Sequence, residues 1–474
     1  MLSIVVLSIL FLSLIMLVVM TYRFRSMEKR RHENISPEFD SLKEDAKQEQ
    51  LVSIQNLVYT SIILVAIAML VVIYFMVRDS PWEGHMMEWL NIVVRLLHIT
   101  FGIVWIGASF YFVFLENALN RNNVRDELAG NLWAIHGGGF YYLEKFKTAP
   151  KEIPKTLHWF KYEAYFTWLS GFCLLFIVYY FNAKAFLIDK NVLDISTAMA
   201  VSISIGSFIV SWIIYDLLCK SPLIKKSFWF AVIGFILATS FAYFYAQVFS
   251  SRAAYIHFGA MLGTIMAANV FFNIIPSQKA MVKAAKLGLT LNPELGKKAG
   301  LRSLHNNYLT LPVLFVMISN HFPSTFGNKH AWAVLAAISL ATAGVKHYLN
   351  LKEKGQLQVW VLPISIILIF GISMYTAPQK STTECKTAIR FAEVNSIINT
   401  RCISCHSSKP TDDLWTAPPN GVVYDTPADI VKLKDNILQR AVITKTMPLN
   451  NKTNMTPEER ETIRCWIEQG ASLK

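Results

Sequence analysis

The chain has 474 residues, of which 53% are hydrophobic and 16% are charged. A water-soluble globular protein of this length carries more charge and fewer large apolar residues, so the composition indicates that most of the chain lies in a lipid bilayer. The formal net charge of +13 would suit a nucleic-acid-binding protein, but the Lys and Arg residues stand between apolar runs of roughly 20 residues, where the positive-inside rule accounts for them. Nucleic acid is therefore not an expected partner.

Ten apolar runs follow one another along the chain, each about long enough to cross a hydrocarbon core of roughly 30 Å as a helix. They begin near Met1, Val52, Leu90, His158, Asp194, Lys226, Arg252, Tyr308, Lys329 and Leu357. The run at Tyr308 is short and contains Pro312, so its helix is expected to kink, to tilt or to begin earlier, at His305. The sequence predicts an all-α fold, a polytopic transmembrane bundle of about ten helices.

The loop charges predict the orientation of these spans. Ten spans put both termini on one side, and the five loops on the other side hold about 24 Lys and Arg, against about five in the remaining loops. The basic loops are therefore expected in the cytoplasm, and the C-terminal tail in the periplasm beside a bacterial inner membrane. The first run has no basic residue before it and several from Arg23 onwards, which predicts a retained anchor with its N-terminus outside the cell rather than a cleaved signal peptide.

Changes in composition divide the chain into three expected domains. Residues 1–52 form a membrane anchor with a charged cytoplasmic linker, and residues 53–377 form the transmembrane helical domain. Residues 378–474 have a soluble composition with scattered Pro and Asp. They predict a periplasmic domain of about 95 residues, a normal size for an independent fold.

This C-terminal segment contains Cys402-Ile403-Ser404-Cys405-His406, the C-x-x-C-H pattern in which two thiols attach a haem and the next His binds its iron. A helical stretch precedes the pattern, Met447-Pro448 follows it, and an amphipathic helix closes the chain. The order resembles small class I cytochromes c, so we expect one covalent haem c with Met447 as the second iron ligand and Met455 as its rival. No second C-x-x-C or His pair in the tail completes a zinc site.

Cys385 and Cys465 flank this segment in stretches that are expected to be helical. The periplasm is oxidising, and the terminal helices of class I cytochromes c pack together, so a disulfide is one expectation. Two free thiols are the alternative.

Ionisable residues inside apolar runs are costly and gather here at two depths. Near the outer face lie Arg95 and His98 of one span and Arg252 and His257 of another. The two histidines fall at similar depth. They leave open a second redox cofactor such as haem b, a metal site, or two histidines that only face the bundle interior.

A second polar set is expected near the inner face. It comprises Glu116, Asn117, Arg121, His136, Asp216, Asn269, Asn273, His305-Asn306-Asn307 and Lys346-His347. The glycines after His136 suit a sharp turn, a close approach to a ligand or a flexible loop. His305-Asn306-Asn307 could equally be a helix cap.

Several longer segments resemble the bacterial membrane-bound urate oxidase (urate hydroxylase) family. They are Ile103–Tyr111, His136–Tyr141, His158–Tyr165, Asp216–Pro222, Gly263–Phe272 and His305–Pro312. Together they cover the chain from about Trp89 to Thr376. A C-terminal cytochrome c domain also belongs to the family's layout, whereas the N-terminal anchor and linker exceed its usual eight-helix core.

The resemblance implies oxidation of urate to 5-hydroxyisourate in purine degradation, with electrons passed through haem c to the respiratory chain. Urate is a planar anion, so its pocket needs cationic or amide donors and a base. The outer candidates are Arg95, His98, Arg252 and His257, and the inner ones are Arg121, His136, Asn269 and His305. The sequence does not choose between the two ends.

Urate is made in the cytosol, and an inner pocket would lie about a bilayer, roughly 30 Å, from a periplasmic haem. A relay at His98 and His257 is expected for that reason. Two other functions stay open, a cytochrome subunit that takes electrons from quinol or a partner without a urate site, and a purine transporter with a cytochrome appendage.

Overall fold

The structure, a computed structural model, describes residues Ser61, Ser80, 82–150, 152–154, 156–377, 384–385, 387–413, Trp415 and 417–473. The chain forms two compact units, Met1–Trp89 and Leu90–Lys474. The spans expected near Met1 and Val52, and with them the anchor and linker of residues 1–52, lie outside the described residues.

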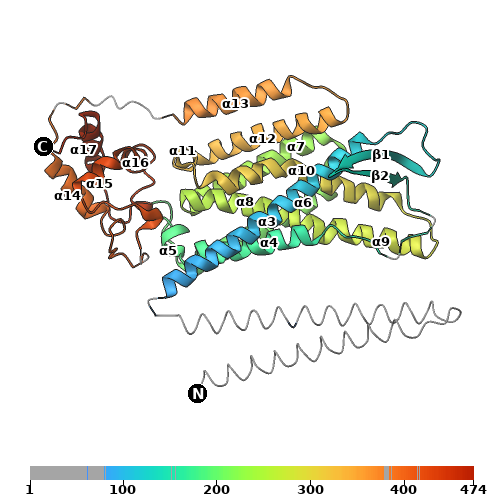
Figure 1. Cartoon of the computed structure of the whole chain (residues 1–474), viewed down its shortest axis with the longest axis horizontal. Coiled ribbons are helices and arrows are strands. Elements are labelled where there is room, and N and C mark those ends of the chain that lie inside the picture. The colour runs from blue at the N-terminus through green and yellow to red at the C-terminus, as the bar shows by residue number, and fades with distance from the viewer. Residues whose placement is uncertain are drawn as a thin grey trace, which may run out of the picture. The chain divides into compact units, whose positions relative to one another are not determined.

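Long helices make up most of the described chain (Figure 1). They are α3 (Glu83–Ala118), α4 (Tyr162–Leu174) continued by the π-helix η1 (Leu175–Tyr180), α6 (Thr197–Lys220), α7 (Ser227–Val248), α8 (Ser251–Asn269) continued by the π-helix η3 (Val270–Ile274) and α9 (Ile275–Lys286), α10 (Pro293–Ser319), α12 (Ala331–Glu353) and α13 (Val361–Tyr375). The short helices α5 (Ala183–Phe186), η2 (Pro222–Lys225) and α11 (Pro323–Phe326) lie between them.

Six of these helical segments are long and apolar enough to cross a membrane, those that begin at Glu83, Tyr162, Thr197, Ser227, Ser251 and Ala331. Large apolar side chains such as Ile103, Ile213 and Ile367 stay exposed along the bundle. Such exposure is expected of a surface that contacts lipid. The structure therefore agrees with a membrane protein, with six candidate spans in the described residues.

Helix α10 begins well before the expected start at His305 or Tyr308. The side chain of Asn292 accepts a hydrogen bond from the backbone N–H of Glu294, and Pro293 occupies the first turn, so the helix has a regular N-terminal cap. Pro312 lies inside the helix. The early start places Arg302 on a helix rather than in a basic loop.

The expectation of an all-α fold is wrong in one segment. Strands β1 (Leu128–His136) and β2 (Gly139–Phe146) form an antiparallel hairpin in the basic loop after α3. Its two-residue turn is Gly137 and Gly138, with φ of 57° and 81°, and L side chains adopt such positive values rarely. The glycines after His136 are therefore explained by a tight turn.

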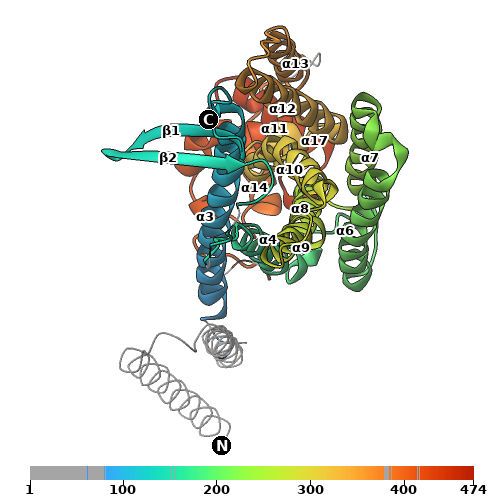
Figure 2. The ribbon, with the colours of Figure 1, turned by 90° about the vertical axis from the view of Figure 1, so that its right-hand side faces the viewer.

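Helix α8 is the centre of the bundle. It packs against α4, α6, α7 and α10, and Figure 2 shows α8 and α10 between α3 on one side and α6 and α7 on the other. A Cβ on Gly259 would lie 2.4 Å from Cγ1 of Val316 in α10, so only glycine permits this approach. Close packing brings the polar side chains of α8 and α10 within hydrogen-bonding distance.

The C-terminal segment has its own hydrophobic core. Its helices are α14 (Phe391–Arg401), η4 (Pro419–Gly421), α15 (Pro427–Lys432), α16 (Lys434–Ile437), η5 (Leu438–Ile443), η6 (Leu449–Asn451) and α17 (Pro457–Glu468). Helices α14 and α17 pack together around Ile398, Ile463 and Trp466. A capping box between Thr456 and Glu459 starts α17.

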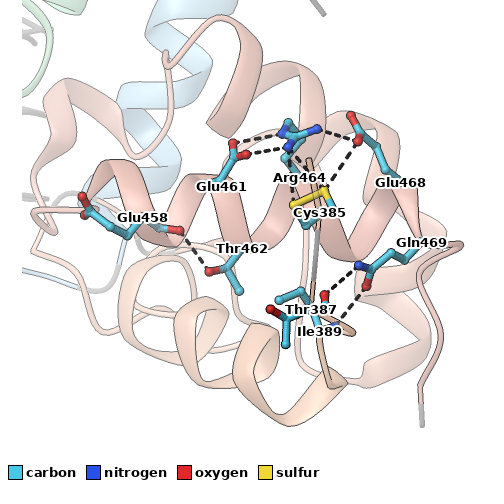
Figure 3. The surroundings of a disulfide bond; sticks show 10 residues. Cys385, Thr387, Ile389, Glu458, Glu461, Thr462, Arg464, Glu468 and Gln469 are labelled. Carbon is cyan, nitrogen blue, oxygen red and sulfur yellow. Dashed lines mark hydrogen bonds and ion pairs between the residues drawn. A yellow bond between two sulfur atoms is a disulfide. The ribbon is translucent and has the colours of Figure 1, made fainter. Parts of the chain in front are cut away.

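A disulfide joins Cys385 to Cys465, with their Cα atoms 5.5 Å apart (Figure 3). Gln469 holds the same segment, because its Oε1 accepts from the N–H of Ile389 (3.0 Å) and its Nε2 donates to the carbonyl of Thr387 (2.8 Å). The expectation that these two cysteines pair is confirmed.

Replacing both cysteines, Cys385→Ala with Cys465→Ala, should lower the free energy of unfolding of the C-terminal segment by about 4 kcal/mol, because the bond closes a chain separation of 80 residues. Hydrogen exchange of the α14 and α17 amides measures the effect, and Cys173→Ala, which removes an exposed free cysteine, is the control. Unchanged exchange in the double variant would contradict this account.

Candidate functional site

Four consecutive residues of α10 make polar contacts with four different helices. His305 Nδ1 bonds to Tyr215 OH of α6 (2.8 Å), Asn306 Oδ1 accepts from Asn269 Nδ2 of α8 (2.8 Å), Asn307 Nδ2 donates to Ser109 Oγ of α3 (3.2 Å), and Tyr308 OH bonds to His347 Nδ1 of α12 (2.7 Å). Since adjacent residues point about 100° apart around a helix, one short stretch reaches every neighbour. Helix α10 therefore forms side-chain hydrogen bonds with four other helices of the bundle.

A buried ion pair lies one turn before this stretch. The guanidinium of Arg302 is 3% exposed; its Nη2 lies 2.6 Å from Asp216 Oδ1 in α6, and its Nη1 donates to Asn269 Oδ1 (3.2 Å). Lys220 Nζ approaches the other oxygen of Asp216, also at 2.6 Å. The carboxylate thus joins one buried and one exposed cation.

Asn269 links the ion pair to a tyrosine and a histidine. Its Nδ2 donates to Tyr215 OH (3.0 Å), and the same phenol oxygen lies 2.8 Å from Nδ1 of His305, where the tautomer of the histidine decides which group donates. A neutral His305 with its proton on Nδ1 has a free lone pair on Nε2, and Phe230 stacks on the ring at 4.8 Å between centroids. We define the arginine cluster as Tyr215, Asp216, Asn269, Arg302, His305 and Asn306.

A second group of buried polar side chains lies between α3, α10 and α12. Lys346 and Asn350 of α12 are 0% and 3% exposed. The Lys346 Nζ, both polar side-chain atoms of Asn350 and the Oδ1 of Asn307 form no hydrogen bond with any described residue. The ammonium lies 3.3 Å from the centre of the Phe110 ring. We define the lysine cluster as Phe110, Asn307, Lys346 and Asn350.

The outer candidates make different hydrogen bonds. Arg95 is exposed and donates to Asn91 (3.0 Å) on its own helix, whereas Arg252 donates from Nε to Asn320 Oδ1 (3.1 Å). The Nδ1 of His98 lies 3.0 Å from the carbonyl oxygen of Thr167, and a Cβ on Gly171 would come within 2.8 Å of that ring. His98 is thus a contact between α3 and α4.

His257 is fully buried in an aromatic cage. Its Nδ1 bonds to the carbonyl oxygen of Ala253 (2.8 Å), and its Nε2 has no hydrogen-bond partner among the described residues. Rings within about 6 Å surround it. They belong to Phe249, Tyr179, Phe208, Tyr245 and Tyr180.

The expected cofactors, one haem c and a second redox cofactor at His98 and His257, are wrong. No group of three or more His, Cys, Asp and Glu side chains in the described parts of the chain is placed to hold a metal ion. His98 forms a hydrogen bond with α4, and aromatic rings surround His257, so the two histidines do not form a common site.

The predicted haem attachment residues have other surroundings in the C-terminal segment. Cys402 and Cys405 are free, and His406 Nδ1 bonds to the carbonyl oxygen of Val422 (3.1 Å). Burial raises the pKa of the Cys402 thiol to about 12, also raises the pKa of Cys405, and lowers the pKa of His406. These groups are therefore uncharged at neutral pH.

The backbone of Met447 and the side chain of Met455 have contacts within the protein. Met447 N donates to the carbonyl oxygen of Arg440 (3.0 Å), and Met455, at 3% exposure, packs in the hydrophobic core with Trp466. Met455 is thus part of the core of this segment.

Of the inner candidates, only Asn269 and His305 share a cluster. Arg121 instead binds the start of the hairpin, where its Nη1 donates to the carbonyl oxygen of Ala129 (2.8 Å), and His136 is exposed beside the hairpin turn. The sequence pattern does not single out Arg302, because Arg302 precedes the apolar run at Tyr308 and falls in one of the basic loops. Its spacing of three and four residues from His305 and Asn306 was the available signal.

Residues 84–377 match the family model described as urate oxidase N-terminal. Both clusters lie within this match. No curated protein and no solved structure matches the chain.

Asp216→Asn should lower the free energy of unfolding by about 3 kcal/mol, because it leaves the buried guanidinium of Arg302 without its counter-charge. Unfolding in mixed micelles measures the change. Adding Arg302→Met to Asp216→Asn should recover part of the loss, since no unpaired charge then stays buried.

Glu294→Gln is the matched control, because it breaks an exposed pair with Lys297 on the same helix as Arg302. Its effect should stay below about 1 kcal/mol. Equal losses in Asp216→Asn and Glu294→Gln would show that the Arg302 pair has no special role in stability.

Proposed function

Because the chain belongs to the urate oxidase N-terminal family, we propose that it is a membrane-bound oxidoreductase that oxidises urate to 5-hydroxyisourate. The family match supports the substrate and the class of enzyme. The arginine cluster is the observation that supports the location of the proposed active site, because it contains a buried cation, amide groups and a Tyr–His pair within the matched segment.

The reaction removes two electrons from urate and adds the oxygen of water. Urate and one water give 5-hydroxyisourate, two protons and two electrons, so the site must orient a planar anion, take up protons and pass electrons to an acceptor. A base within hydrogen-bonding reach and fixed donors meet the first two needs.

The arginine cluster supplies these groups in a fixed geometry. Asp216 and Asn269 hold the guanidinium of Arg302, so its orientation does not depend on the substrate. When Nδ1–H of His305 donates to the phenol oxygen of Tyr215, the Nε2 lone pair of the imidazole is left to take a proton from the substrate or its water. We assign proton transfer to the Tyr215–His305 pair and substrate orientation to Arg302.

The charge pattern of the loops supports an orientation of the chain in the membrane and, with it, an acceptor for the electrons. We propose ten spans in a bacterial inner membrane, with the arginine cluster towards the cytoplasm and the C-terminal segment in the periplasm. Asn450 of that segment donates to the carbonyl oxygens of Ala185 (2.8 Å) and Ile188 (2.9 Å), in a loop with few basic residues, which supports this side. A component of the respiratory chain would accept the electrons.

Purified protein, given urate and a soluble dye as electron acceptor, should consume urate and form 5-hydroxyisourate. Arg302→Met and His305→Gln should each lower kcat/KM by about 100-fold or more, because the first removes the orienting cation and the second removes the base. Loss of the ultraviolet absorbance of urate measures the rate.

Lys297→Met is the matched control, since it removes an exposed cation from the same helix and should leave the rate unchanged. Arg302→Lys should restore little activity, because an ammonium cannot bridge Asp216 and Asn269 as a guanidinium does. Wild-type activity in Arg302→Met and His305→Gln would show that the reaction does not take place at the arginine cluster.

A further inference from the structure

The lysine cluster contains a cation that forms no direct ion pair with any described residue. Lys346 Nζ is fully buried and makes neither an ion pair nor a hydrogen bond with a described residue. Lysines near the end of a transmembrane helix normally extend their amines towards the interface. Lys346 instead turns inwards, over the face of the Phe110 ring.

Its polar neighbours are also unsatisfied. Asn350 lies one turn from Lys346 on α12 and leaves both its amide nitrogen and its carbonyl oxygen without a partner, and Asn307 leaves its Oδ1 free while its Nδ2 is fixed by Ser109. Buried polar groups are nearly always hydrogen-bonded. One ammonium, one free amide and one free carbonyl oxygen in the same layer therefore point to a missing ligand.

We propose that Lys346, Asn350 and Asn307 bind the negative charge and one polar edge of a planar, singly charged oxopurine anion, the class to which urate belongs. The ammonium matches the charge, the amide nitrogen matches a ring carbonyl, and the two amide oxygens match ring N–H groups. Phe110 supplies a flat apolar wall. The inference rests on the proposed function, and it assigns recognition of the negative charge of the substrate to Lys346, while Arg302, whose charge Asp216 already neutralises, keeps its role in orienting the substrate.

A thermal-unfolding assay with and without urate tests this assignment on the full chain in detergent. Without ligand, Lys346→Met should unfold at the same or a higher temperature than wild type, because methionine fills a similar volume and removes an uncompensated charge. Urate should raise the unfolding temperature of wild type but not of Lys346→Met, and the KM for urate should rise at least tenfold.

Lys352→Met, which replaces an exposed lysine on the same helix, is the control and should respond to urate as wild type does. Asn350→Leu should weaken the response without removing it. Stabilisation of wild type by anionic phosphatidylglycerol but not by urate would assign the ammonium to a lipid phosphate and overturn the proposal. A lower unfolding temperature of ligand-free Lys346→Met with an unchanged urate response would also overturn it, since the lysine would then be structural.

The assay separates this inference from the proposed function. If wild type turns over urate and urate raises the unfolding temperature of Lys346→Met as much as that of wild type, the proposed oxidase function stands and the lysine site is rejected. A urate response that depends on Lys346, without any turnover, supports the lysine site and rejects the oxidase.

Discussion

The ion pair between Arg302 and Asp216 is the interaction on which the rest of the arginine cluster depends. Two charges in an apolar bundle are tolerated only when each has its partner and its remaining donors are used, and Asn269 completes this requirement by accepting from Arg302. The pair joins α6 to α10, and Asn269 brings in α8. Losing the correct register of any one of these helices would expose an unpaired charge to the hydrocarbon interior.

Two backbone features place side chains around that pair. Helix α10 starts at Pro293, so Arg302 and the four polar residues after it share one continuous helix. On the facing helix, Pro276 lacks the N–H for a regular bond to the preceding turn, and the π-helix η3 ends at Ile274, two residues before it. The wider turn lies directly after Asn269 and contains Asn273, so the amide side chains of this helix are no longer in simple α-helical register.

Apolar runs and loop charges were sufficient to predict the long helices and the polar character of Asn269 and His305. They failed where local chemistry overrides a pattern. Arg302 was assigned to a loop because the apolar run begins only at Tyr308, yet a cap at Asn292 extends the helix over a polar stretch. The hairpin was missed because its strands lie in a basic loop. The C-x-x-C-H pattern predicts a cofactor, although Met455, one of the two expected methionine ligands, packs in the hydrophobic core.

The two clusters differ in charge, and this difference suggests different roles for them. In the arginine cluster every charge has a partner, so its geometry is fixed before any ligand arrives, and a fixed arrangement suits proton transfer. In the lysine cluster the charge of Lys346 is unbalanced, so an anion would gain most by binding there. Asn306 belongs to the arginine cluster and Asn307 belongs to the lysine cluster. Two adjacent residues of α10 therefore connect the group proposed to bind the anion with the group proposed to transfer protons.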